Sequence, residues 1–451
     1  MKNSTKIWGL IGAAAMIAPV GLSAPALADG GKDGRQINSP ALNAHIARIL
    51  NKTTMGNRSA GRLSSFATNS RSPSLNRLLE WHEVMLDANA LDHTPSSGVA
   101  GDQQGPVRNS RAFAIIQIAV FDAVNSFSLK YQSFSRGIRR APAGASVDAA
   151  ISEAAYRTLI AMYPLQTDRL TALYNSDQAL IQGTEASKAA GRAVGLAAAN
   201  AILDARLEDG AGPAGTSAVV DFGAGGAVAT GGTNIFGEPV NGGETAAPRW
   251  APDRGPADDG VVPEIRNAAL GANWGAVTPF VLRSGAQFRI PAYPAQGSPR
   301  YLAAYRDVFR NGGEDILGVV GTNNTAAKQF IGNYWGYDGA PALGTPPRLY
   351  NQIAVTVADA RGLTNLDDYS RLLALVNVTM GDSGIAAWDS KYFHNYWRPG
   401  NGIRDDDGVP GTRQLDSWRP FGASVINEAV PERFTPPFPA IRRATQRSAL
   451  P

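Results

Sequence analysis

Cysteine is absent from this chain and histidine is scarce. Without cysteine there are no disulfide bonds, no thiolate nucleophile and no cysteine-ligated metal site. The four histidines are scattered, and none has the His-x-x-x-His spacing that binds zinc on a helix: His45, His82, His93 and His394. The composition therefore argues against thiol chemistry and against a zinc site.

The chain also has little net charge once its two ends are set aside. The formal charge is +4, but two lysines lie in residues 1–28 and three arginines lie in residues 441–451, so the body between them carries −1. Nucleic-acid binding normally needs a basic surface that neutralises phosphates. A nucleic acid is therefore not expected as a partner.

Long apolar runs are missing except at the start. Residues 1–28 combine Lys2 and Lys6, an apolar stretch interrupted by Pro19, and a small-x-small end at Ala28. This order is typical of a secretory signal peptide; the alternative, an uncleaved membrane anchor, needs a longer unbroken span. We expect cleavage after Ala28 and a secreted or periplasmic protein that no longer contacts the membrane.

The rest of the sequence predicts an all-α protein with long Gly/Pro-rich loops. Residues 29–72 are rich in Ser, Asn, Gly and Arg and are interpreted as a flexible leader, followed by one helical domain over 73–440. Apolar residues at helical spacing predict helices at 75–90, 108–127, 147–162, 186–207, 298–311, 325–335, 347–361 and 367–397. Residues 209–248 predict one unusually long loop.

One motif near the C-terminus carries the chemistry. Lys391 and Arg398 are seven residues apart, which on a helix places them nearly one above the other, and Trp388 lies on the same side. Pro399 disfavours helical geometry at Arg398, so the arginine is expected at the helix end. A lysine and an arginine so arranged suit one tetrahedral oxyanion. By spacing alone a solvated cation pair is the more ordinary explanation. The surrounding residues are apolar and aromatic, however, and buried cations there would need an anion.

With this motif the chain resembles the vanadium-dependent haloperoxidases, and most of all the chloroperoxidase type. The likeness extends over residues 329–440 and, more loosely, over 111–125. These proteins share a helical bundle with type 2 phosphatidic acid phosphatases and bacterial acid phosphatases. The resemblance thus implies a bundle of the haloperoxidase/acid phosphatase type.

The resemblance also implies roles for particular residues. Lys391 and Arg398 would hold vanadate, for which phosphate is an analogue. Trp388, Pro436 and Phe438 would form the wall of a halide site, and Asp338 would orient a third cation from further downstream. For Trp388 and Phe438 the alternative is ordinary core packing, and for Asp338 it is a turn residue.

The implied reaction is halide oxidation by hydrogen peroxide at bound vanadate, giving hypohalous acid for a small organic acceptor. The protein would supply preorganised charge and one acid-base histidine. Two alternatives stay open. One is a phosphatase of the same superfamily, since phosphate is also a tetrahedral oxyanion. The other is a non-catalytic protein that binds an oxyanion or a partner.

The sequence departs from the family after Ala440. The expected Pro-Ser-Gly-His, with the acid-base histidine, and the expected Ser-Arg-x5-His, with the third cation and the vanadium ligand, do not occur. Deleting one base from codons for Ala-Tyr-Pro-Ser-Gly-His and the following text reproduces residues 441–451, with Thr445 where the histidine would stand. We hypothesise an out-of-frame tail, missing final core helices and little peroxidase activity. His394 is interpreted as a packing residue and not as a replacement ligand.

Overall fold

The computed structural model describes residues 71–211, 270–313, 342–404 and 408–415, together with a few isolated positions. Within these ranges the chain is helical, with one isolated bridge between Pro410 and Thr412 and no strand. The all-α prediction is confirmed. No helix in the described part of the chain is long and apolar enough to cross a membrane.

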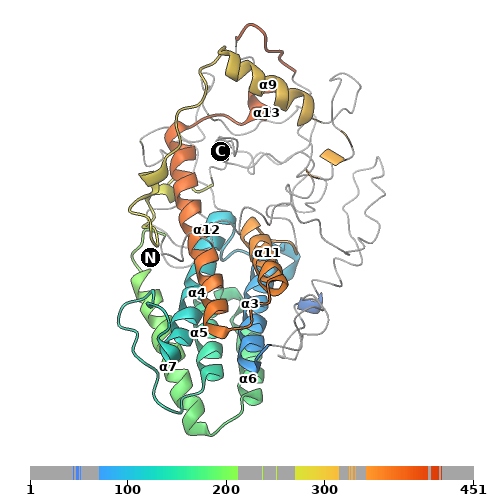
Figure 1. The fold of residues 1–451 in the computed structure, drawn as a ribbon. Coiled ribbons are helices and arrows are strands. Elements are labelled where there is room, and N and C mark those ends of the chain that lie inside the picture. Colours follow the sequence, from blue (N-terminus) through green and yellow to red (C-terminus); the bar gives the residue numbers. More distant parts are fainter. Residues whose placement is uncertain are drawn as a thin grey trace.

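The centre of the bundle is α4 (Pro106–Ser128), in which 20 of 23 residues are buried. It packs against α12 (Leu366–His394), α5 (Val147–Met162) and α7 (Glu185–Ala205), as Figure 1 shows. Further helices surround this centre or lie beyond it: α3 (Pro73–Asp92), α6 (Thr167–Leu180), α9 (Pro299–Asn311), α11 (Pro346–Ala360) and α13 (Pro399–Arg404).

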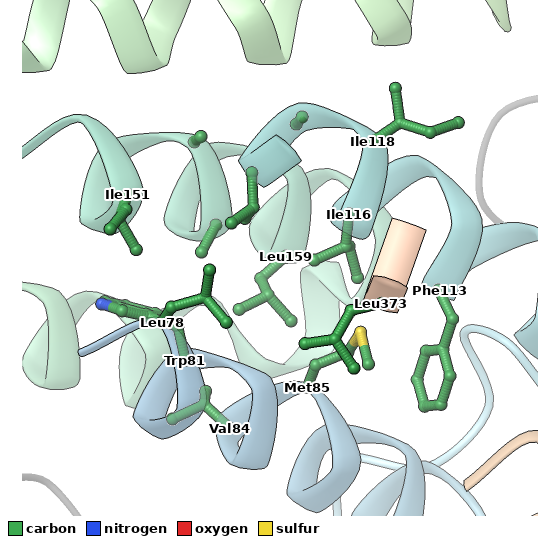
Figure 2. Close-up of a cluster of buried hydrophobic side chains, with 14 of the residues drawn as sticks. Leu78, Trp81, Val84, Met85, Phe113, Ile116, Ile118, Ile151, Leu159 and Leu373 are labelled. Carbon is green, nitrogen blue, oxygen red and sulfur yellow. The ribbon is translucent and has the colours of Figure 1, made fainter. Parts of the chain in front are cut away.

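Apolar side chains from α3, α4, α5, α6, α7, α11 and α12 form the main core. Figure 2 shows Trp81 and Met85 of α3, Ile116 of α4, Leu159 of α5 and Leu373 of α12 in one cluster. Each of these side chains is at most 1% exposed. The helices are thus held together mainly by burial of apolar surface.

The helix α7 approaches α5 closely because two glycines face it. A Cβ atom at Gly191 would lie 2.1 Å from the Ser146 carbonyl oxygen, and one at Gly195 would lie 2.4 Å from that of Ala150. Both distances are far below van der Waals contact. Only glycine therefore allows the two backbones to pack at this separation.

Seven of the eight expected helices lie within a few residues of α3, α4, α5, α7, α9, α11 and α12. The helix α6 was missed, because its exposed polar residues hide the apolar pattern. The helix expected at 325–335 and most of the loop expected at 209–248 lie outside the described residues. At the end of the segment interpreted as a flexible leader (29–72), two residues contact the bundle. Ser72 caps α3 by accepting a hydrogen bond from the Leu75 amide, and Arg71 forms a buried salt bridge with Asp359.

Candidate functional site

The last turns of α12 bring Trp388 and Lys391 together. Both residues are only 6% exposed, and the Lys391 ammonium lies 4.0 Å from the centroid of a Trp388 ring. This is a cation–π contact, in which the negative face of the indole attracts the charge. The lysine also lies in the final turn of a 29-residue helix, where the helix dipole favours a positive charge.

A single backbone carbonyl holds the aromatic side chains beside this lysine. The Leu270 carbonyl oxygen accepts hydrogen bonds from Trp388 Nε1 at 2.9 Å and from the Tyr392 hydroxyl at 2.8 Å. The next residue, Gly271, has φ +68°, and a Cβ there would lie 2.4 Å from Trp388 Nε1. The turn at Leu270 can thus contact the indole only because glycine follows it.

Arg398 does not continue this helix, and the expected stacking of Arg398 above Lys391 on one helix is wrong. The helix ends at His394 because Asn395 adopts the left-handed conformation, with φ 45°, and its amide donates to the Lys391 carbonyl. Arg398 immediately precedes Pro399, which begins α13, and its carbonyl accepts from the Gly402 amide. Arg398 therefore lies at the start of a second helix, half-buried.

Arg398 nevertheless acts electrostatically on two tyrosines, one of which, Tyr392, follows Lys391 in the sequence. Burial raises the pKa of Tyr392 well above 10, and the Arg398 guanidinium opposes this shift. Burial raises the pKa of Tyr293 too, and the Arg398 charge again acts in the opposite direction. Since Tyr392 is the residue after Lys391, the turn at Asn395 keeps both cations of the motif around one aromatic cluster.

A segment about 100 residues upstream lines the same part of α12, and no sequence pattern predicts this contact. Arg289 binds Asp389 with two hydrogen bonds, of 2.7 and 2.9 Å, and stacks over Phe393 at 3.8 Å. Asp382 accepts hydrogen bonds from three successive backbone amides: those of Phe280, Val281 and Leu282. These carboxylates fix the segment along the helix, and the pairing of Arg289 with Asp389 is geometrically specific.

His394 is a packing residue in this arrangement, as the sequence analysis interpreted it. Its Nε2 atom lies 2.8 Å from the Ile290 carbonyl oxygen, which only accepts, so Nε2 carries the proton. The ring also makes edge contacts with Tyr293 and Phe393. Nε2 is thus engaged with the carbonyl, and Nδ1 is the ring nitrogen that keeps a lone pair.

Three of the residues proposed for the site are not among those that the structure describes: Asp338, Pro436 and Phe438. The residues that the structure describes contain no cluster of acidic or histidine side chains able to hold a metal ion. The described part of the candidate site thus consists of two cations, Lys391 and Arg398, set among aromatic side chains.

Comparison with known proteins agrees with the motif. Residues 371–442, which contain both cations, match the VCPO second helical-bundle domain. The vanadium chloroperoxidase of Curvularia inaequalis is 39% identical over 155 residues, which is 32% of this chain and 24% of that protein. The match thus spans only about a quarter of the fungal protein's length. The crystal structure described as the first bacterial vanadium-dependent iodoperoxidase has the same fold, with a TM-score of 0.54 and 21% identity over 80% of this chain and 76% of that chain.

Proposed function

We propose that this chain, which belongs to the vanadium haloperoxidase family, uses Lys391 and Arg398 to bind vanadate as a tetrahedral oxyanion. Vanadium haloperoxidases are peroxidase-type enzymes. The resemblance to them implies hydrogen peroxide and a halide as substrates. The observation that carries the proposal is the burial of Lys391 at the end of α12, within the part of the chain that matches the family's second bundle. A buried ammonium is costly unless an anion or hydrogen bonds compensate it.

The described residues fit the electrostatic part of vanadate binding. Lys391 offers a compact charge and Arg398 a planar fork of donors, and these suit the oxygens of a tetrahedral anion. Bound vanadate would supply activation of peroxide toward attack by a halide. Within the chain, Lys391 and Arg398 would hold and orient the anion, and the aromatic side chains around them would exclude water.

The described residues do not fit the covalent part. His82 is buried within α3, and His93 is buried at the C-terminal end of the same helix. His394 donates to the Ile290 carbonyl. Neither histidine motif expected from the family occurs in the sequence. We therefore propose oxyanion binding by the described residues, with little or no halide oxidation from these residues alone. A phosphatase of the same superfamily and a non-catalytic oxyanion binder are the alternatives.

Vanadate titration by calorimetry tests the proposal. The purified chain should bind orthovanadate, with phosphate as a competitor. Lys391→Met and Arg398→Gln should each weaken binding about tenfold or more, as expected for losing one charge-assisted contact of about 1.5–3 kcal/mol. Lys188→Met on α7 serves as the control that removes a lysine elsewhere. Absence of binding, or equal binding by Lys391→Met, would refute the proposal.

Activity assays separate the alternatives. Bromide oxidation by the vanadate-loaded protein with peroxide would contradict the expected inactivity. Hydrolysis of a phosphate monoester, lost in Lys391→Met, would instead identify a phosphatase. Saturable vanadate binding without either reaction is the expected result.

A further inference from the structure

We propose that Leu270, Trp388 and Tyr392 form a positioning unit for the Lys391 ammonium, and that Trp388 serves as a platform for this cation and not as a halide contact through its N–H group. The proposal rests on the proposed function, because it takes Lys391 as an anion-binding group. It changes the role that the family resemblance implied for Trp388, which was to form part of a halide wall.

The indole N–H is already used. Trp388 Nε1 donates to the Leu270 carbonyl oxygen at 2.9 Å, and this atom has only one proton to donate. A halide near the indole would therefore meet a donor that is engaged elsewhere. Breaking this bond would also leave a half-buried carbonyl with one partner fewer, which opposes rotation of the ring.

The indole face is the part that meets charge. The Lys391 ammonium lies 4.0 Å from a ring centroid of Trp388, three residues earlier on the same face of α12. Residues three apart on a helix lie on neighbouring turns, so the helix itself brings the two side chains together. The orientation of the ring then determines where the ammonium lies.

Tyr392 fixes that orientation from the following turn. Its hydroxyl donates to the same Leu270 oxygen at 2.8 Å, and the residue is 1% exposed. Burial raises the pKa of this hydroxyl well above 10, so it stays protonated and remains a donor at all ordinary pH values. The carbonyl is thus held by two donors at positions i and i+4 of one helix, and neither the ring nor the turn can shift alone.

NMR of the complete chain labelled with ¹³C at the lysine Cε tests the arrangement. A proton above an aromatic ring is shifted upfield, so one lysine signal of the wild type should lie upfield of the others and vanish in Lys391→Arg. It should return to the ordinary position in Trp388→Leu. In Tyr392→Phe it should move part of the way, and vanadate affinity should fall about fivefold, the effect of one hydrogen bond of about 1 kcal/mol.

Tyr369→Phe is the matched control. Tyr369 lies on the same helix, is fully buried, and donates its hydroxyl to Asp359 at 3.1 Å. Its position 23 residues earlier places it about 35 Å from Tyr392 along the helix axis. Tyr369→Phe should reduce stability but leave the Lys391 signal and the vanadate affinity unchanged.

The outcomes separate this inference from the proposed function. No upfield lysine signal in the wild type, or a signal that Tyr392→Phe leaves in place, would overturn the positioning unit. An upfield signal that responds to both variants, in a protein that binds no vanadate, would uphold the unit and overturn the proposed function. Vanadate binding with an unshifted Lys391 signal would uphold the proposed function and overturn the positioning unit.

Discussion

Gly271→Ala adds only one methyl group but should reduce both the stability of the protein and its affinity for vanadate. The residue follows Leu270, has φ +68°, and leaves no room for a Cβ, which would lie 2.4 Å from Trp388 Nε1 and 2.6 Å from Trp388 Cδ1. Real Cβ atoms do not approach other atoms so closely. Either the turn or the indole must therefore move, and the hydrogen bond from Trp388 to Leu270 must lengthen or break.

The magnitude follows from three effects. A left-handed backbone costs alanine about 1–2 kcal/mol relative to glycine. Overpacking a buried contact costs about 1–3 kcal/mol, and losing one hydrogen bond costs about 1 kcal/mol more. Together these effects should lower the free energy of unfolding of Gly271→Ala by about 3–6 kcal/mol. Because Trp388 carries the Lys391 contact, vanadate affinity should fall as well.

Gly362→Ala isolates the backbone effect. Gly362 has φ +67°, which nearly equals that of Gly271, but a Cβ there would have no atom within 4 Å. It should lose only about 1–2 kcal/mol and keep full vanadate affinity. Urea unfolding and vanadate titration of both variants provide the measurement. Equal losses of stability in the two variants would show that the contact with Trp388 does not restrict the turn.

Three further predictions concern the rest of the chain. Burial lowers the pKa of His82 to about 3, below the 6.5 of an unfolded chain. The unfolded state therefore takes up the proton first, and the free energy of unfolding falls by about 2 kcal/mol between pH 8 and pH 5. His82→Gln should remove that part of the pH dependence in urea unfolding. Gly195→Ala should lower the melting temperature by more than Gly362→Ala, because its Cβ would lie 2.4 Å from the Ala150 carbonyl; a similar melting temperature would contradict the close packing of α5 and α7. Export in a bacterial host should give a mature protein beginning at Asp29 by mass spectrometry, and an intact Met1 would refute the signal peptide.

The out-of-frame hypothesis has its own test in the gene. Resequencing across the codon for Ala440 and about 200 bases beyond should restore a frame that encodes Pro-Ser-Gly-His and then Ser-Arg-x5-His. If no single-base insertion restores such a frame, the hypothesis is wrong. The protein from a restored frame should oxidise bromide with peroxide when loaded with vanadate.

The sequence by itself determined the fold class and the central motif. Apolar residues at helical spacing fixed most helices, because each such helix must bury one continuous stripe against its neighbours. The apolar pattern did not predict α6, because only Leu170, Leu173 and Asp177 among its 14 residues are buried. The close spacing of Lys391 and Arg398 was likewise visible, since both side chains belong to one short stretch.

Only the tertiary structure decided how the motif is built. The helix carrying Lys391 stops at Asn395 because a left-handed residue ends it, and no periodicity signals that conformation. The partners of this helix, Leu270, Gly271 and Arg289, come from about 100 residues upstream. The Leu270 carbonyl accepts from Trp388 and Tyr392, and Arg289 pairs with the Asp389 carboxylate. These contacts form only when the upstream segment packs against the helix. Local pattern encodes which residues form a helix, whereas the neighbours of a buried cation are determined by which segments pack against it.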